Sequence, residues 1–388
     1  MRARSVASRS QPGWVKRLAL VLLLTAGPIL CLPAIRCIQL LFTQDLVVDR
    51  HTEAWKAREK LIARAKVFVT PRPVIRQLDL SDPPTAAVPF DRTALTECQY
   101  VPKLTTGTTP KFDCRLADGS LIKIKYGGTP ERLAEVAATR LLAALGFGAD
   151  EVTLLQRVRC QGCPPHPFVT RKTAEWFLAG WLVDRLFGRE SREFNWVSVE
   201  RKLPGRAIEA DGFEGWDWSE LDRVDASAGG ATRAELDALR LMAIFLGHWD
   251  TKARNQRLLC EKGEGESDPS APCERPLLMI HDVGATFGPG KVEETNWAAT
   301  PIWADAGSCT VKLPHRDGTF DTIRISEAGR VLMAGRLRQL SETQIATIFQ
   351  SAGFPDPASG ETNGDVTLWV KAFRDKVRQI DNRPACRG

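Results

Sequence analysis

The sequence predicts an α+β chain in which a small strand-rich lobe precedes a larger, mainly helical lobe. Two observations carry this prediction. Short alternating runs separated by turns begin near residue 97, and long stretches with apolar residues at three and four spacing occupy most of the later part of the chain. A third observation, an early apolar segment that comes after several cations, predicts a membrane anchor ahead of both lobes. The 388 residues are 43% hydrophobic and 26% charged, which excludes a disordered or fibrous chain.

The apolar segment covers residues 18–35, which contain no charge, and its apolar character resumes as far as residue 42. Five cations precede it, at Arg2, Arg4, Arg9, Lys16 and Arg17. We therefore expect a basic cytoplasmic tail over residues 1–17 and a transmembrane signal anchor over residues 18–42. The cationic flank predicts a single-pass membrane protein whose main domain is extracytoplasmic, either periplasmic or lumenal. A cleaved signal peptide and a buried core helix are the alternatives.

The positive charge of the chain is concentrated beside this segment. The formal net charge is +6, and the first fifty residues hold seven Arg or Lys against two Asp, which accounts for +5 of it. The remaining 338 residues are nearly neutral, so the charge describes membrane topology and no nucleic-acid partner is expected.

Residues 43–96 are predicted to form a helical stalk, over 51–66, followed by a proline-rich linker. The strand-rich lobe is placed at residues 97–165. Within it, the runs 111–116 and 121–126 flank an Asp-Gly turn and predict a hairpin. A helix over 130–145 and an apolar strand over 152–158 come next.

The helical lobe is placed at residues 166–388. Apolar spacing predicts helices over 174–187, 233–246, 342–349 and 366–380, with a short apolar strand over 276–280. Residues 261–275 are acidic and rich in Pro, Ser and Gly, and they predict a loop inserted into this lobe.

Eight of the ten cysteines lie beyond residue 42, an even number that four disulfides can accommodate in an oxidising compartment. Cys260 and Cys273 stand near the ends of the inserted loop and are the pair that the sequence best supports. Cys98–Cys114 and then Cys309–Cys386 are the next candidates. Cys160 and Cys163 could instead form half of a zinc site, although a second Cys-x-x-Cys or a His pair is missing. Reduced thiols are the alternative if the chain is not exported.

A concentrated set of polar residues comes directly after the helix over 233–246. It has the spacing His-x-Asp-x-Lys-x-x-Asn, with Asp250, Lys252 and Asn255, and an apolar pair comes shortly after. The strand over 276–280 then leads to Asp282-Val283-Gly284 within the longer pattern Asp-x-Gly-x-x-Phe-Gly. Phosphoryl transfer needs these residue types: a carboxylate to orient the attacking hydroxyl, a cation on the phosphate and oxygen ligands for a divalent metal.

These motifs, in this order, resemble the catalytic loop and the metal-binding element of the protein-kinase-like superfamily. The resemblance is strongest to its atypical branches, which include HipA-like, secretory-pathway and phosphatidylinositol-kinase-like kinases. It implies a two-lobed protein-kinase-like fold that binds ATP between the lobes with Mg²⁺ or Mn²⁺. It also implies Asp250 as the base, Lys252 as the cation on the γ-phosphate, and Asn255 and Asp282 as metal ligands.

The same resemblance implies a lysine on a strand that binds the nucleotide phosphates and pairs with a glutamate on the next helix. Lys123 and Lys125 lie on one face of the predicted strand, and Glu135 lies on the next helix along the chain. Lys125 is favoured because related kinases place this lysine at the end of the strand. Upstream, Gly107 and Thr108 lie in a Thr/Gly loop whose N–H groups and hydroxyls could cover the phosphates.

The sequence also departs from conventional protein kinases. It has no Gly-x-Gly-x-x-Gly, Val283 replaces the usual Phe, and no Ala-Pro-Glu comes after it. A literal His-Arg-Asp also occurs, at residues 315–317, but it is rejected because Thr322 stands where Asn is required and no Asp-x-Gly follows. The acceptor therefore stays open between a protein and a small-molecule hydroxyl. Two other functions stay open as well: a non-catalytic, pseudokinase-like binding module at the membrane, and an adenylyl transferase with the nucleotide reversed.

Overall fold

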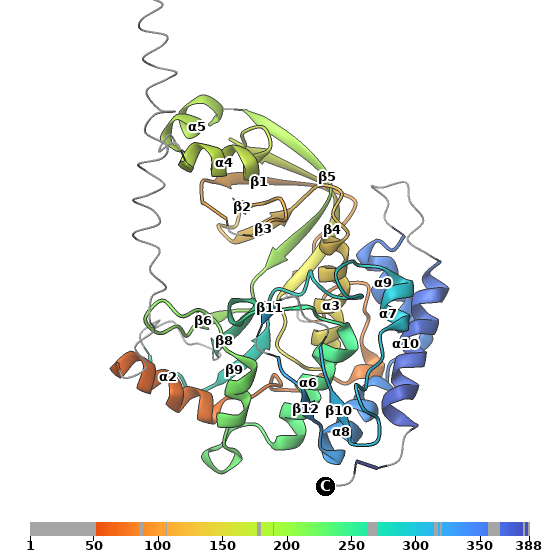
Figure 1. Cartoon of the computed structure of the whole chain (residues 1–388). Coiled ribbons are helices and arrows are strands. Elements are labelled where there is room, and N and C mark those ends of the chain that lie inside the picture. The colour runs from red at the N-terminus through yellow and green to blue at the C-terminus, as the bar shows by residue number, and fades with distance from the viewer. Residues whose placement is uncertain are drawn as a thin grey trace, which may run out of the picture. The chain divides into compact units, whose positions relative to one another are not determined.

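The computed structural model describes residues 52–386, apart from residues 85–87, 106, 177–179, 189, 263–270, 314–316, 319, 356–364 and 383–384. The predicted basic tail and anchor, residues 1–17 and 18–42, lie outside this part of the chain. The described residues belong to one compact unit, His51–Gly388. The prediction of a strand-rich part followed by a helix-rich part is confirmed (Figure 1).

None of the helices in the described part of the chain is both long enough and apolar enough to cross a membrane. The longest of them, α10 (Val366–Asp381), has 16 residues and carries charged residues along its length. The prediction of a single-pass membrane protein with an extracytoplasmic main domain is contradicted by this finding, and the membrane is not among the partners that we propose for the chain.

Five strands close a small barrel in the order β1-β2-β3-β5-β4 (Figure 1). The strands are β1 (Leu95–Val101), β2 (Lys111–Arg115), β3 (Leu121–Lys125), β4 (Glu151–Gln161) and β5 (Ser191–Arg201). β1 and β4 are parallel, and the other neighbours are antiparallel. The predicted hairpin joins β2 to β3 in a register that places Lys111 opposite Lys125. Apolar side chains of alternating positions, including Phe112, Ile124 and Val199, fill the interior.

The barrel continues to Arg201, beyond the predicted end of the strand-rich lobe at residue 165. The difference arises because two helices, α4 (Pro167–Trp176) and α5 (Gly180–Phe187), are inserted between β4 and β5. They occupy the region where one helix over 174–187 was predicted. β5 returns the chain to the barrel and pairs with both β3 and β4, so it also forms the wall next to Lys125.

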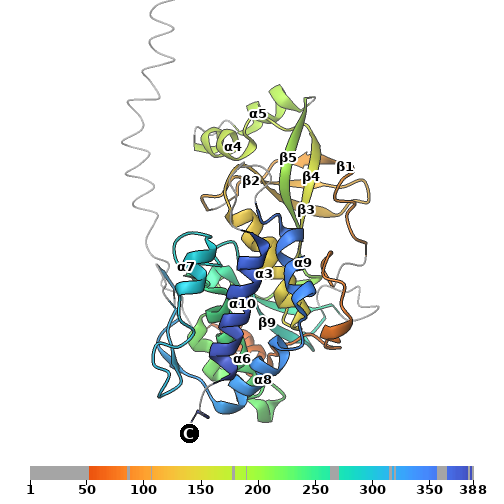
Figure 2. The same ribbon diagram turned by 90° about the vertical axis from the view of Figure 1, so that its right-hand side faces the viewer.

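The second part of the unit is built around α6 (Arg233–Leu246). Thr232 and Glu235 form a capping box at its start, and Gly247 ends it in the left-handed conformation at φ 62°. Further helices are α3 (Glu131–Ala144), α7 (Glu294–Ala299), α8 (Glu327–Leu337) and α9 (Glu342–Ala352). α6 packs on α8, and α9 packs on both α3 and α10 (Figure 2).

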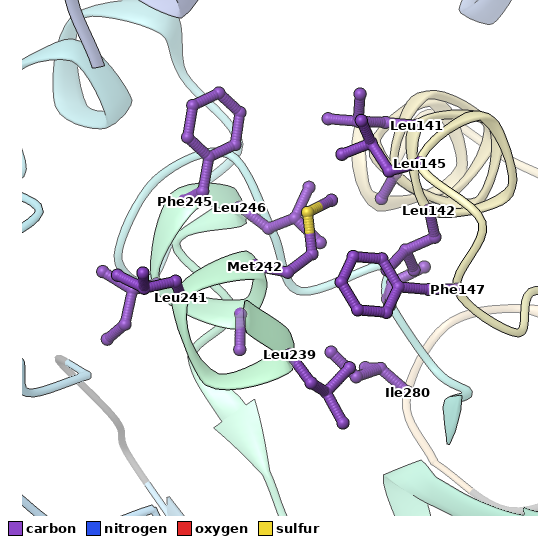
Figure 3. Packing of buried hydrophobic residues seen from close by; sticks show 14 of the residues in the cluster. Leu141, Leu142, Leu145, Phe147, Leu239, Leu241, Met242, Phe245, Leu246 and Ile280 are labelled. Carbon is purple, nitrogen blue, oxygen red and sulfur yellow. The ribbon is translucent and has the colours of Figure 1, made fainter. Parts of the chain in front are cut away.

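One hydrophobic core joins the helix of the strand-rich part to the helical part (Figure 3). Leu141 of α3 and Leu145, which comes directly after this helix, face Met242 and Leu246 of α6 across the core, and all four are fully buried. Ile280, the last residue of β9 (Pro276–Ile280), packs into the same cluster. Because Asp282 comes two residues later, this packing positions the segment that carries the Asp-x-Gly motif.

The predicted stalk and linker are part of the packed unit. Helix α2 (Glu53–Arg64) forms where expected, but it buries Trp55, Arg58 and Ile62. The Arg58 guanidinium makes two hydrogen bonds to the Glu220 carboxylate, at 2.6 and 2.9 Å, and one to the carbonyl oxygen of Gly215 at 2.7 Å. Further on, Lys66 exchanges backbone hydrogen bonds with the β9 strand. Residues 52–80 therefore extend the helical lobe.

This buried ion pair gives a stability prediction. We expect Arg58→Met to lower the free energy of unfolding by about 3–5 kcal/mol, because it leaves Glu220 as a buried carboxylate without a cation. The matched control is Lys56→Met on the same helix, whose partner Glu53 is exposed, and it should change stability by less than about 0.5 kcal/mol. Urea unfolding of both variants measures the difference, and equal losses would contradict a structural role for α2.

The predicted disulfides are confirmed. Cys260–Cys273, Cys98–Cys114 and Cys309–Cys386 are all bonded. Cys160 and Cys163 are bonded to each other, so they are not half of a zinc site. The Cys260–Cys273 bond closes the base of the inserted loop between β8 (Gln256–Glu261) and β9.

Candidate active site

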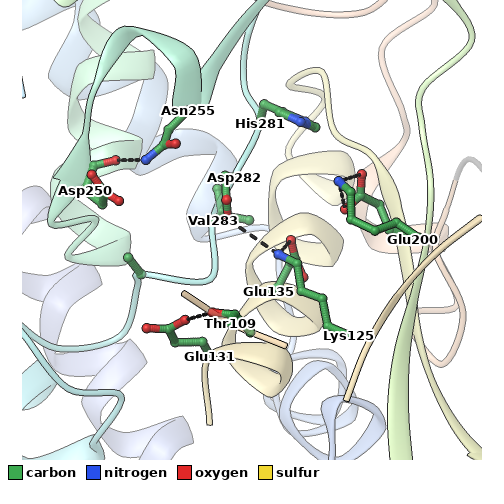
Figure 4. Close-up of polar contacts among 12 residues, drawn as sticks. Thr109, Lys125, Glu131, Glu135, Glu200, Asp250, Asn255, His281, Asp282 and Val283 are labelled. Atoms are coloured by element: carbon green, nitrogen blue, oxygen red, sulfur yellow. Dashed lines mark hydrogen bonds and ion pairs between the residues drawn. The ribbon is translucent and has the colours of Figure 1, made fainter. Parts of the chain in front are cut away.

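The first group of charged residues lies where β3 and α3 meet the Asp-x-Gly segment (Figure 4). Lys125, the last residue of β3, has its Nζ 2.5 Å from Glu135 Oε1 on α3. The same Nζ lies 3.5 Å from Asp282 Oδ1, so one ammonium joins three segments. Lys125 and Glu135 are only 6% and 3% exposed, whereas the Asp282 side chain is 40% exposed. The carboxylate that reaches solvent is therefore the one predicted to bind metal.

The charge state of this group depends on its surroundings. Burial by itself disfavours the Lys125 cation, but Asp282 and Glu135 outweigh it and hold the pKa of the ammonium well above its ordinary value. Lys125 in turn holds the pKa of Asp282 far below the usual range, against the opposing effect of burial. Burial raises the pKa of Glu135, and Lys125 opposes that rise. These shifts favour an ionised Asp282 beside a protonated Lys125 at neutral pH.

The second group comes from the loop after α6. Asn255 Nδ2 donates to the backbone oxygen of Asp250 at 2.8 Å, which fixes the turn between the two residues. Lys252 Nζ lies 3.2 Å from Asp250 Oδ1, and both side chains are about one-third exposed. His248 is fully buried, and burial lowers its pKa, so its neutral ring donates from Nδ1 to the Ala285 carbonyl at 3.1 Å. This contact ties the Asp250 loop to the Asp-x-Gly loop.

The two loops also meet at Asn255. Its backbone oxygen accepts hydrogen bonds from the N–H groups of His281 and Asp282, at 2.9 and 3.0 Å. Because Asn255 Nδ2 is used by Asp250, its side-chain oxygen is the atom left for another partner. That oxygen and the Asp282 carboxylate are hard donors of the kind that Mg²⁺ and Mn²⁺ prefer. The residues present therefore fit a divalent metal.

The loop between β1 and β2 contains the predicted phosphate-covering residues. Gly107 and Thr108 are exposed, and Gly107 has φ 87°, which a glycine adopts without strain. The loop is held from two sides: Thr109 Oγ1 donates to Glu131 Oε2 at 2.6 Å, and Lys172 Nζ donates to the Gly107 carbonyl at 2.7 Å. The two contacts, to α3 and from α4, hold this loop in place beside the barrel.

Two lysines of the barrel are placed differently from the sequence expectation. Lys123, predicted as an alternative to Lys125, has its Nζ 2.7 and 2.8 Å from the two carboxylate oxygens of Glu200 on β5. Lys111 was not selected from the sequence, yet it lies opposite Lys125, and a Cβ placed on Gly107 would be 3.2 Å from its Nζ. Burial lowers the pKa of Lys111, and the nearby charge of Lys125 lowers it further. The register of the predicted hairpin, which places Lys111 opposite Lys125, is the sequence signal that could have identified Lys111.

The rejected His-Arg-Asp lies beside the selected loop. Asp317 pairs its backbone with Asp250 in a short parallel bridge between β11 (Asp317–Gly318) and β7 (Asp250–Thr251). His315 and Arg316 lie outside the described residues. The segment therefore supports the backbone of the Asp250 loop.

Comparison with known proteins finds only distant structural similarity. No protein-family model and no curated protein sequence matches the chain. Among solved structures, the chain is similar to the Helicobacter pylori proinflammatory kinase CtkA, with a TM-score of 0.44 and 9% identical residues. The match covers 75% of this chain and 98% of that one. A similarity this distant carries no functional argument, so a functional proposal depends on the geometry of the site.

Proposed function

We propose that this chain is a kinase-like phosphotransferase that moves the γ-phosphoryl group of ATP to a hydroxyl of a protein or small molecule. The observation that carries the proposal is the position of Lys125 between Glu135 and Asp282, at 2.5 and 3.5 Å. Three segments that are far apart in the sequence supply these charges. The Asp250 loop is joined to the same place through the backbone of Asn255.

Each side chain then has a task that its geometry supports. Lys125, oriented by Glu135, binds the nucleotide phosphates. Lys111, its neighbour across the hairpin on β2, supplies a second cation. Asp250 accepts the proton of the acceptor hydroxyl and orients it, while Lys252 balances charge on the transferred phosphate. Gly107 and Thr108 cover the phosphates from the loop that Lys172 and Glu131 hold in place.

Asp282 and the side-chain oxygen of Asn255 would bind Mg²⁺ or Mn²⁺. When bound, the metal would neutralise phosphate charge in the way that divalent ions do in phosphoryl transfer. Lys125 keeps Asp282 ionised, and the backbone of Asn255 holds it in place. Lys123 has no part in this proposal because Glu200 occupies it.

The test is the fate of labelled ATP with the full-length protein. We expect metal-dependent release or transfer of label from the γ-phosphate and none from the α-phosphate. Transfer of α-label to a protein acceptor would instead assign adenylyl transfer to the fold. A nucleotide-induced rise in thermal stability without turnover would assign a binding module, because a ligand of the folded state stabilises it whether or not it reacts. Either result would overturn the proposal.

A further inference from the structure

A buried carboxylate outside the predicted set, Asp150, lies where three segments meet. It ends the connection from α3 to β4, and its side chain is 1% exposed. Its Oδ1 accepts a hydrogen bond from the backbone N–H of Leu203 at 2.7 Å and lies 3.3 Å from Arg257 Nη1. Its Oδ2 lies 2.6 Å from His281 Nδ1. Both oxygens of this carboxylate are therefore occupied, as burial of an anion requires.

The three segments that Asp150 contacts come from different parts of the fold. Leu203 belongs to the connection between the barrel and the helical lobe, Arg257 lies on β8, and His281 directly precedes Asp282. Burial alone would raise the pKa of Asp150, but His281, Arg257 and the Leu203 N–H together hold it well below the usual range. The carboxylate is thus an anion that binds all three segments at neutral pH.

The peptide that carries Asp282 is held from two sides. On one side, the backbone oxygen of Asn255 binds the N–H groups of His281 and Asp282. On the other side, the His281 ring is fixed by Asp150. We propose that Asp150 is a positioning residue that aims the metal-binding carboxylate of Asp282, and that it acts through His281. This inference rests on the proposed function, because it concerns the metal ligand of that site.

The geometry favours this role over a metal site at Asp150 itself. Asp150, Glu200 and His281 do place possible ligand atoms within 4.8 Å of one another. However, both oxygens of Glu200 are bound to Lys123, and both oxygens of Asp150 are bound to Leu203, Arg257 and His281. Lys123 and Arg257 already balance the two carboxylates, so a divalent cation would have to displace existing partners. Asp150 and its partners therefore hold the backbone segment next to Asp282 in place and do not bind a metal themselves.

The experiment measures Mn²⁺ binding without turnover. The dissociation constant for Mn²⁺ alone is read from the electron paramagnetic resonance signal of the free ion, with the full-length protein. We expect Asp150→Asn to raise this constant about 10-fold, the lower end of the effect of removing a direct partner of a metal ligand, because Asp150 contacts the residue before the ligand. The matched control is Glu151→Gln, the adjacent half-buried carboxylate, which should leave it unchanged. Loss of thermal stability in Asp150→Asn with an unchanged constant would overturn the inference.

A double variant tests the route. If Asp150 acts through His281, then Asp150→Asn combined with His281→Gln should bind Mn²⁺ no more weakly than His281→Gln alone. Additive losses would overturn the proposed route. If Asp150→Asn does not fold, His281→Gln alone still tests the proposal, because it should weaken Mn²⁺ binding to the same extent. Unchanged Mn²⁺ binding in Asp282→Ala would instead overturn the metal assignment of the proposed function, and this inference with it.

Discussion

Asp250→Asn is expected to lower kcat by about 10²- to 10⁴-fold, the usual contribution of a positioned general base. The change removes the carboxylate that would accept the acceptor proton. It leaves the backbone oxygen of Asp250, and with it the hydrogen bond from Asn255, in place. We propose that nucleotide binding depends on Lys125 and Asp282, which the change does not touch, so the KM for ATP should stay within about twofold of the wild-type value.

Steady-state kinetics with the full-length protein separates this outcome from a general loss of structure. Asp321→Asn, an exposed carboxylate in the helical lobe, serves as the control and should retain wild-type kcat. A raised KM with an unchanged kcat in Asp250→Asn would mean that Asp250 binds the nucleotide and does not act in the chemical step. That result would move the general base to another residue.

The parts of the site that are local in sequence could be predicted. Asp250, Lys252 and Asn255 lie within six residues of one another directly after a helix with clear capping signals, so their proximity needs no tertiary information. The Asp-Gly turn similarly fixes the pairing of β2 with β3. Asp282 comes shortly after the short apolar strand β9, and the packing of Ile280 into the hydrophobic core positions this segment.

The choice between Lys123 and Lys125 could not be made from the residues alone. The two alternate onto the same face of β3, and local sequence gives them equal access to Glu135. Glu200 distinguishes them in the structure, because it lies opposite Lys123 on β5 and binds that lysine, whereas Lys125 binds Glu135. β5 itself was missed, since the insertion of α4 and α5 separates it from the other barrel strands. Which of the two lysines pairs with Glu135 therefore depended on β5, a strand that the sequence pattern did not predict.

Buried charges with distant partners were missed for the same reason. Arg58 lies on a helix whose sequence is charged and predicts exposure, but it is buried against Glu220, which is 162 residues away in the sequence. Asp150 resembles an ordinary residue before a strand, although its partners at 203, 257 and 281 come from three later segments. A charged side chain signals burial only through the partner that compensates it, and a single sequence does not show that partner.

Lys125→Met is expected to destabilise the protein by about 3–5 kcal/mol at about pH 8, because it leaves Glu135 as a buried carboxylate without its cation. Burial already raises the pKa of Glu135 in the wild-type protein, and Lys125 opposes that rise. Without Lys125 the pKa rises further, so folded Glu135 keeps a proton at pH values where the unfolded chain has lost it. The folded state then binds more protons than the unfolded state, and stability falls as the pH rises. The deficit should shrink toward about pH 5.

Urea unfolding across this pH range checks the prediction, and the double variant Lys125→Met with Glu135→Gln isolates its cause. Lys125 also lowers the pKa of Asp282, and that effect is lost equally in the single and double variants. Only the single variant retains an ionisable group at position 135. We therefore expect the double variant to be the more stable of the two at about pH 8, with the difference vanishing at lower pH. Parallel pH profiles for the two variants would show that Glu135 is not the group that Lys125 neutralises.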